Sequence, residues 1–253
     1  MMRLVMPALL ALGLLVAPAV ARAADVFTPA QRAEIVRVVR EALKNDPTIM
    51  RDAIGSLQAA ESASQDAAAR AAIAASRDAL MHDPADPVGG NPKGDVTVVE
   101  FFDTRCPYCR KLEPAMAELL RRDSGVRLVF KDLPILGPAS VLGSKALLAA
   151  QNQEAKVPGA YEKLRSVLMQ PAQQHTQEGI LESAGRVGLD TARLQADMAD
   201  PAIQKRIEAN LRLAHTLGIE GTPALVIGDD LIPGAVDVAA LQEAVKAARG
   251  ATR

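Results

Sequence analysis

Residues 99–109 read VEFFDTRCPYC, and this stretch decides how the rest of the chain is interpreted. The segment 95–102 is rich in β-branched and aromatic residues and is typical of a buried β-strand. The pattern that follows predicts a helix over residues 107–122, because proline is tolerated at the first turn of a helix. The only two cysteines, Cys106 and Cys109, therefore lie between the end of a strand and the start of a helix.

Two cysteines with this spacing suit dithiol–disulfide chemistry. A helix N-terminus favours negative charge and so favours the thiolate form of the first cysteine. We expect Cys106 to be the exposed nucleophile and Cys109, one turn further on, to be the buried resolving thiol. Pro107 and Tyr108 complete the motif. A disulfide between the cysteines closes too small a ring to stabilise the fold much, so its value is chemical.

A C-x-x-C pair could also be half of a metal site. The sequence holds no second cysteine pair, and its three histidines, His82, His175 and His215, are distant from the motif. We interpret these histidines as surface residues and predict no metal site. The alternative is copper(I) bound by the thiolates of Cys106 and Cys109. No cofactor is expected beyond the redox-active Cys106–Cys109 disulfide.

The composition excludes several classes of protein. With 29 basic and 30 acidic residues in 253, the net charge is -1, which is unlike the basic balance of a nucleic-acid binder. Aromatic residues make up 2% of the chain, with no Trp, so a stacking platform for bases or sugars is not expected. The apolar fraction of 49% is sufficient for a globular core.

Residues 1–23 have the layout of a secretory signal peptide. Arg3 precedes an apolar run over residues 4–20, and the small residues that follow predict cleavage after Ala23. An uncleaved membrane anchor is the alternative, but the run is short for a span of about 20 residues. We therefore expect a soluble protein exported to the periplasm, an oxidising compartment.

Residues 24–85 are predicted to form a helical segment and a linker. Residues 28–31 read TPAQ, which is a capping-box start with proline at the first helical position. Amphipathic stretches over 29–44 and 48–58 are followed by an alanine-rich helix with little bulk to bury. Their apolar stripes either pack against the following domain or meet copies of themselves in other subunits.

The rest of the chain, residues 86–253, is predicted to be one α/β domain. Further strands are expected at 126–130, 224–227 and 231–234, and a long helical region occupies 139–217. The first strand–helix–strand unit favours a parallel pair.

Four motifs together resemble the DsbA-like thioredoxin-fold family: VEFF at 99–102, CPYC at 106–109, FKDLP at 130–134 and GTPA at 221–224. The resemblance covers roughly residues 94–250. It implies a thioredoxin fold with a helical insertion at about 138–205, preceded by the N-terminal helical segment. It also implies that Thr222-Pro223 is a cis bond facing the cysteines, where exposed backbone groups can pair with an extended substrate.

The same resemblance implies roles for Glu100 and Lys131. They match a buried acid beneath the active site and a lysine paired with it. A buried carboxylate near a thiol can shuttle its proton and tune its ionisation. Thr222 is similar to the isomerase-type members, and CPYC departs from the CPHC of the strongest oxidases, which argues against extreme oxidising power.

The N-terminal segment carries a second resemblance. Residues 27–31 and 44–50 are similar to the leader of copper-sensitivity-suppressor proteins of the ScsC type and of Com1-like proteins. Some of those leaders form trimers and confer isomerase activity. The resemblance implies a homotrimer with a link to copper tolerance. Its partners would be exported proteins with disulfides or thiols and a membrane redox partner that reduces or oxidises the CPYC motif.

We therefore interpret the chain as an exported thiol–disulfide oxidoreductase, a protein disulfide isomerase that isomerises or reduces disulfides. A second interpretation is a monomeric DsbA-like dithiol oxidase, which would rest in the oxidised state, whereas an isomerase would rest reduced. A third is a copper(I)-binding protein, and a fourth is an envelope scaffold in which the CPYC motif is vestigial.

Overall fold

A computed structural model describes residues 27–251 of the chain. The expected signal peptide, residues 1–23, lies outside the described residues. Within 27–251, none of the helices has the length and apolar character needed to cross a membrane. By its internal contacts the chain divides into two units between Gln58 and Ala59.

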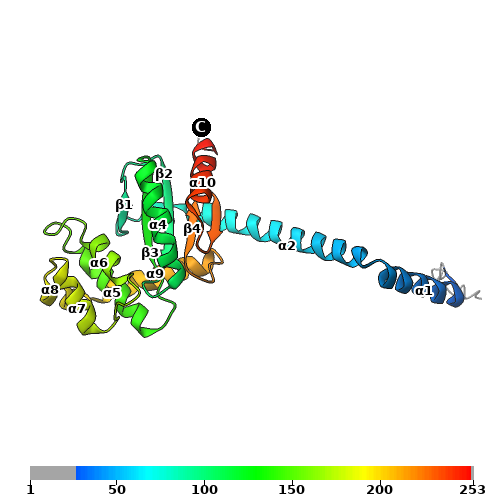
Figure 1. The fold of residues 1–253 in the computed structure, drawn as a ribbon, viewed down its shortest axis with the longest axis horizontal. Helices are drawn as coiled ribbons and strands as arrows, with labels where there is room; N and C mark the ends of the chain where they lie inside the picture. Colours follow the sequence, from blue (N-terminus) through cyan, green and yellow to red (C-terminus); the bar gives the residue numbers. More distant parts are fainter. Residues whose placement is uncertain (1–26, 252–253) are drawn as a thin grey trace, which may run out of the picture. The chain divides into compact units, whose positions relative to one another are not determined.

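Figure 1 shows the helices and strands of the described residues. The elements before the dithiol are α1 (Pro29–Asn45), α2 (Pro47–Ala75), α3 (Arg77–Met81), β1 (Val88–Gly90) and β2 (Val96–Phe102). Then follow α4 (Pro107–Arg122), β3 (Val126–Asp132), α5 (Pro138–Gln151), α6 (Ala160–Leu168), α7 (Gln177–Arg186), α8 (Thr191–Asp197) and α9 (Pro201–Thr216). The C-terminal elements are β4 (Ala224–Ile227), β5 (Asp230–Pro233) and α10 (Val238–Ala251).

The strands form one mixed sheet in the order β1-β3-β2-β4-β5. β2 and β3 run parallel, as the strand–helix–strand pattern predicted, and the other neighbours are antiparallel. α4 and α10 pack against each other beside the sheet (Figure 1). The α/β class is therefore confirmed, and the helical region after β3 contains the helices α5–α9.

The short strand β1 was not expected, because residues 83–92 have the Pro and Gly content of a loop. It pairs antiparallel with β3, with Val88 opposite Val129. Three residues carry too little local signal to predict a strand. Here the pairing with an existing sheet edge determines the conformation.

The N-terminal helices begin as the capping pattern predicted. The Thr28 hydroxyl accepts from the backbone N–H of Gln31, and the Gln31 side chain accepts from the backbone N–H of Thr28. α1 ends at Asn45, and α2 begins at Pro47. Every residue from 27 to 68 is exposed, whereas Ile73, Leu80 and Met81 are buried in a core cluster with residues of the sheet.

Alternation along the strands separates the core into two clusters. In β2 and β3, Val98, Phe102, Leu128 and Phe130 belong to one cluster, and Val99, Phe101 and Val129 belong to the other. Successive strand residues point to opposite faces, so these clusters lie on the two faces of the sheet.

The predicted pairing of Glu100 with Lys131 is wrong. In the parallel register, Glu100 lies opposite Phe130 and Phe101 lies opposite Lys131. Glu100 and Lys131 are therefore one residue out of phase and point to opposite faces of the sheet. The Lys131 ammonium instead contacts the Asp86 carboxylate at 2.5 Å and the Ala79 carbonyl at 2.6 Å, and it is almost fully buried. Lys131 connects the sheet to the segment that precedes β1.

We predict that Lys131→Met destabilises the fold without changing the chemistry at the cysteines. Removing one partner of a buried ion pair leaves the Asp86 carboxylate uncompensated, which typically costs about 3 kcal/mol or more. Urea unfolding at pH 7 should show this loss of free energy, whereas the control Lys205→Met, at an exposed position, should change it by less than about 0.5 kcal/mol. Equal stability of the two variants would contradict the structural role of Lys131.

Candidate active site

The turn between β2 and α4 is shaped by Asp103. Its buried carboxylate accepts from the backbone N–H of Arg105 at 2.8 Å, of Ile135 at 2.9 Å and of Leu136 at 3.0 Å. Its carbonyl accepts from the backbone N–H of Cys106 at 3.0 Å. Sequence reasoning missed Asp103, although an aspartate that bonds the N–H two residues on is a known turn signal.

This turn places Cys106 at the N-cap of α4. Its backbone is extended, and its sulfur accepts from the backbone N–H of Cys109 at 3.4 Å. An N–H donor and a helix N-terminus both favour negative charge on that sulfur. The arrangement is the one that the C-x-x-C spacing predicted, with the two cysteines one turn apart.

Both cysteines are free thiols, and both are buried. Cys109 is inaccessible, as expected, but Cys106 is only 4% exposed, so its expected exposure is wrong. The reason is the loop before β4, because the Cys106 thiol donates to the carbonyl of Thr222 at 3.1 Å. The loop therefore covers the sulfur that a substrate would have to reach.

The Thr222-Pro223 peptide bond is cis, as predicted, and lies beside Cys106. The two segments meet because β2 and β4 are antiparallel, with Phe101 opposite Ala224. The end of β2 and the start of β4 therefore lie at the same edge of the sheet.

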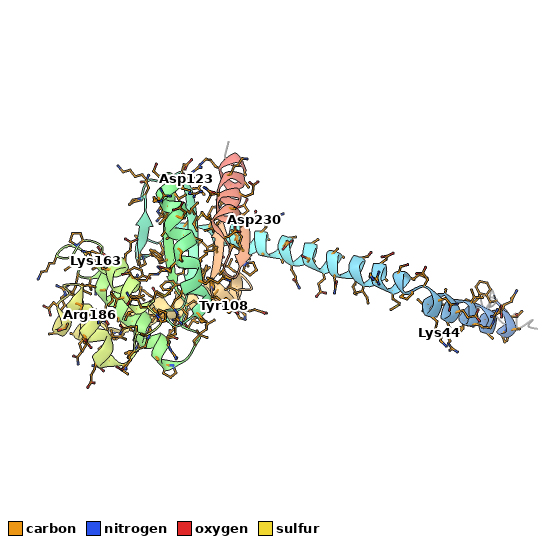
Figure 2. All side chains as sticks on the ribbon, viewed as in Figure 1. Lys44, Tyr108, Asp123, Lys163, Arg186 and Asp230 are labelled. Atoms are coloured by element: carbon orange, nitrogen blue, oxygen red, sulfur yellow. The ribbon has the colours of Figure 1, made fainter. Side chains whose placement is uncertain are left out.

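The surface around the cysteines is apolar. A pocket next to Pro223 is lined by residues 218–224 together with Leu231, Pro233 and Gly234. Tyr108, in the first turn of α4, is 62% exposed, and its side chain is labelled in Figure 2. Ile135 and Leu136, whose N–H groups bind Asp103, are also exposed. Exposed apolar side chains beside a pocket suit a polypeptide substrate.

Glu100 is fully buried on the face of the sheet that carries Phe102 and Phe130. Its partner is Arg165 of α6, whose Nη2 donates to both carboxylate oxygens at 3.1 and 3.0 Å. Burial raises the pKa of Glu100 to about 7, and the charge of Arg165 opposes that rise. Sequence reasoning missed Arg165, which lies 65 residues from Glu100. The signal that could have found it is its place on the apolar face of α6, four residues after Tyr161 and three before Leu168.

Cys109 is held in the protonated form by its surroundings. Burial raises the pKa of its thiol well above the usual range, and the nearby charge of Glu100 raises it further. A hydrogen bond from the backbone of Asp103 acts in the opposite direction. Attack by Cys109 therefore requires a group that accepts its proton.

The histidines divide into two kinds. His82 and His215 are exposed, as predicted. His175 is half-buried, and its Nε2 is buried without a hydrogen-bond partner. It packs near Thr104 against Gly143, where an added Cβ would lie 2.6 Å from the Thr104 hydroxyl and 3.0 Å from the His175 ring. Over residues 27–251 there is no cluster of three His, Cys, Asp or Glu side chains that could hold a metal ion.

Two known protein families match parts of this chain. Residues 97–246 match the DSBA-like thioredoxin domain. The chain belongs to the DsbA-like thioredoxin family. Residues 31–63 match the N-terminal domain of the copper resistance protein ScsC. The predicted fold, a thioredoxin fold with a helical insertion and an N-terminal helical segment, is confirmed, as is the resemblance to ScsC-type proteins.

Several known proteins are similar to this DsbA-like chain. A thioredoxin-like oxidoreductase from Silicibacter pomeroyi is 45% identical, with a TM-score of 0.65, over 69% of this chain and 98% of that one. Proteus mirabilis ScsC in a transitional conformation is 31% identical, with a TM-score of 0.64, over 89% of this chain and all of that one. The thiol:disulfide interchange protein DsbA of Bordetella pertussis is 26% identical over 56% of this chain and 68% of its own length.

The chain also aligns with sodium/proton antiporters. It is 31% identical to NhaA 3 of Salinispora tropica over 192 residues, which is 73% of this chain. The chain spans 29% of that antiporter's length, so the alignment gives no basis for transferring ion transport. The family match instead covers the DSBA-like thioredoxin domain over residues 97–246.

We predict that Cys106 forms the mixed disulfide with substrates. Cys109→Ala should trap a covalent complex with a disulfide-bonded peptide: the Cys106 thiolate displaces one peptide sulfur, and the resolving thiol is missing. Cys106→Ala should trap none, because the remaining Cys109 thiol has no exposed surface and burial raises its pKa, which keeps it protonated. Mass spectrometry under non-reducing conditions measures both. Capture by the Cys106→Ala variant alone would reverse the assignment.

Proposed function

We propose that the chain is an exported thiol–disulfide oxidoreductase that isomerises or reduces protein disulfides through Cys106 and Cys109. The observation that carries this proposal is the contact between the Cys106 thiol and the Thr222 carbonyl. It joins a dithiol at a helix N-terminus to the cis-proline loop, beside a pocket and exposed apolar side chains. Lys131 has no place in this mechanism, whereas Glu100 lies on the dithiol side of the sheet.

The proposed reaction starts with attack of the Cys106 thiolate on a substrate disulfide. A bond forms between Cys106 and one substrate sulfur, and the other substrate sulfur leaves with the electron pair of the broken bond. A second substrate thiolate can then attack the mixed disulfide, which rearranges the substrate and returns the dithiol reduced. If Cys109 attacks instead, the substrate is reduced and the Cys106–Cys109 disulfide forms.

The isomerase part of the proposal is supported by the exposed leader. α1 and the first part of α2 carry nine exposed apolar side chains, each between 37% and 69% exposed: Ile35, Val36, Val38, Val39, Leu43, Ile49, Met50, Ile54 and Leu57. Burying apolar surface stabilises by about 25 cal/mol per Å². We propose that these stripes pack against sister chains in a trimer, which holds several dithiols near one substrate and raises their effective concentration.

The proposal includes the setting in which this chemistry takes place. The leader match to ScsC and the predicted signal peptide support export to the periplasm. There a membrane redox partner would keep the CPYC dithiol reduced. A dithiol oxidase would be held oxidised by its partner, so the resting redox state in the exported compartment separates the two activities.

We predict that removing residues 24–58 yields a monomer with weaker isomerase activity and retained dithiol oxidation. This deletion spares Ile73, Leu80 and Met81, which belong to the core. Analytical ultracentrifugation at micromolar concentration gives the assembly state, and refolding of a scrambled disulfide substrate gives the isomerase activity.

A point variant tests the same stripe without a deletion. Val39→Asp should dissociate the oligomer, whereas Lys44→Asp, on the face of α1 opposite to Ile35, should leave it assembled. If the mature protein sediments as a monomer, the oligomer proposal is wrong, and the dithiol oxidase becomes the better assignment.

A further inference from the structure

Arg165 is buried in a socket built from four side chains. Its guanidinium binds both oxygens of Glu100 and contacts the Glu113 carboxylate at 2.7 Å. Its Cζ lies 4.4 Å from the centre of the Phe102 ring and 4.6 Å from that of Phe130. Its side chain is 7% exposed. Rings at this distance attract a cation, and two carboxylates fix its position.

The socket joins separate parts of the fold. Arg165 comes from α6 in the helical insertion, Glu113 from α4 behind the cysteines, and Glu100 from the central strand. Lys131 of β3, the predicted partner of Glu100, points to the other face of the sheet. The cation beside Glu100 is thus supplied by the insertion.

The groups that face Glu100 have opposing effects. α6 contributes Arg165 and the buried Tyr161 hydroxyl, α4 contributes Glu113 and Cys109, and β3 contributes Asp132. Burial and the negative charges of Glu113 and Asp132 raise the pKa of Glu100, and Arg165 lowers it. Arg165 therefore favours the carboxylate where the rest of the surroundings favour the neutral acid.

We propose that Arg165 is a positioning residue that keeps Glu100 ionised, so that Glu100 can accept the proton of Cys109 when this thiol resolves a mixed disulfide. The inference rests on the proposed function. In this step the Cys109 proton moves to the Glu100 carboxylate, and the Cys109 sulfur bonds to the Cys106 sulfur. The bond from Cys106 to the substrate sulfur breaks, and the substrate leaves as a thiolate that carries the electron pair.

The experiment mixes the reduced protein with a chromogenic aromatic disulfide in a stopped-flow instrument. The first released chromophore reports attack by Cys106 and depends on the concentration of the disulfide. The second released chromophore reports resolution by Cys109, and its rate does not depend on the concentration of the disulfide. In the wild type, the rate of the second phase should rise with pH through an inflection near 7, as Glu100 ionises.

Arg165→Met should move this inflection upward by at least one pH unit. The second phase at pH 7 should then slow by about fivefold or more, because the ionised fraction of Glu100 falls from about one half to about one tenth or less. The first phase should be unchanged, and Arg165→Lys should partly restore the second. Glu100→Gln should abolish the inflection, and this result would show that the titrating group is Glu100 and not Asp132.

The control variant is Arg249→Met. It removes an arginine that also binds two carboxylates, Asp95 and Asp123, and it should keep the wild-type profile.

Glu113→Gln provides a second test if Arg165→Met does not fold. This substitution removes a negative charge that raises the pKa of Glu100, so the inflection of the second phase should move to lower pH. An unshifted second phase in Arg165→Met, or an upward or absent shift in Glu113→Gln, overturns the role of Arg165. Failure of the wild type to release either chromophore overturns the proposed function as well.

Discussion

The register of the central strand β2 is the constraint on which the active site depends. Because β4 runs antiparallel to β2, the residues that follow Phe102 and those that precede Ala224 meet at one edge, which brings Thr222 to Cys106. Because β3 runs parallel with Phe130 opposite Glu100, the acid shares a face with the aromatic rings that hold Arg165. A shift of one residue in the pairing of β2 with β3 would exchange the faces of β3 and place Lys131 on the face where Phe130 now lies.

Local patterns were sufficient to predict the elements that present the dithiol. The strand before the CPYC motif and the helix that starts at Pro107 each have a signal within a few residues, and the family resemblance implied the cis bond at Pro223. The orientation of Lys131 has no local signal. β2 and β3 are buried on both faces, so their sequences lack the polar alternation that would show which residues share a face. The apolar spacing of α6 places Arg165 on its buried face, but its partner Glu100 depends on how α6 packs against the sheet and has no signal in the sequence.

The N-terminal segment allowed two interpretations from sequence, packing against the domain or packing against other copies. The end of the segment packs against the domain: Ile73, Leu80 and Met81 contribute to its core, and Lys131 binds Asp86 in the segment that follows them. All residues from 29 to 58 are exposed, and the proposed trimer is the surface that would cover their apolar stripes. Alanine extends α2 between these parts with good helix propensity and little bulk.

The two buried ion pairs show why burial alone does not define a function. Removing two charges from water often costs more free energy than their attraction recovers, so a buried ion pair is weak evidence for stability. The pair of Lys131 and Asp86 also bonds the Ala79 carbonyl and so holds a connecting segment, which is a structural use. The pair of Arg165 and Glu100 lies instead beside a thiol that must lose its proton inside the core. A buried thiol cannot release that proton directly to water, so an ionised carboxylate within reach shortens its path. In the proposed resolution step Glu100 accepts this proton, and Arg165, which the insertion supplies, positions the acid.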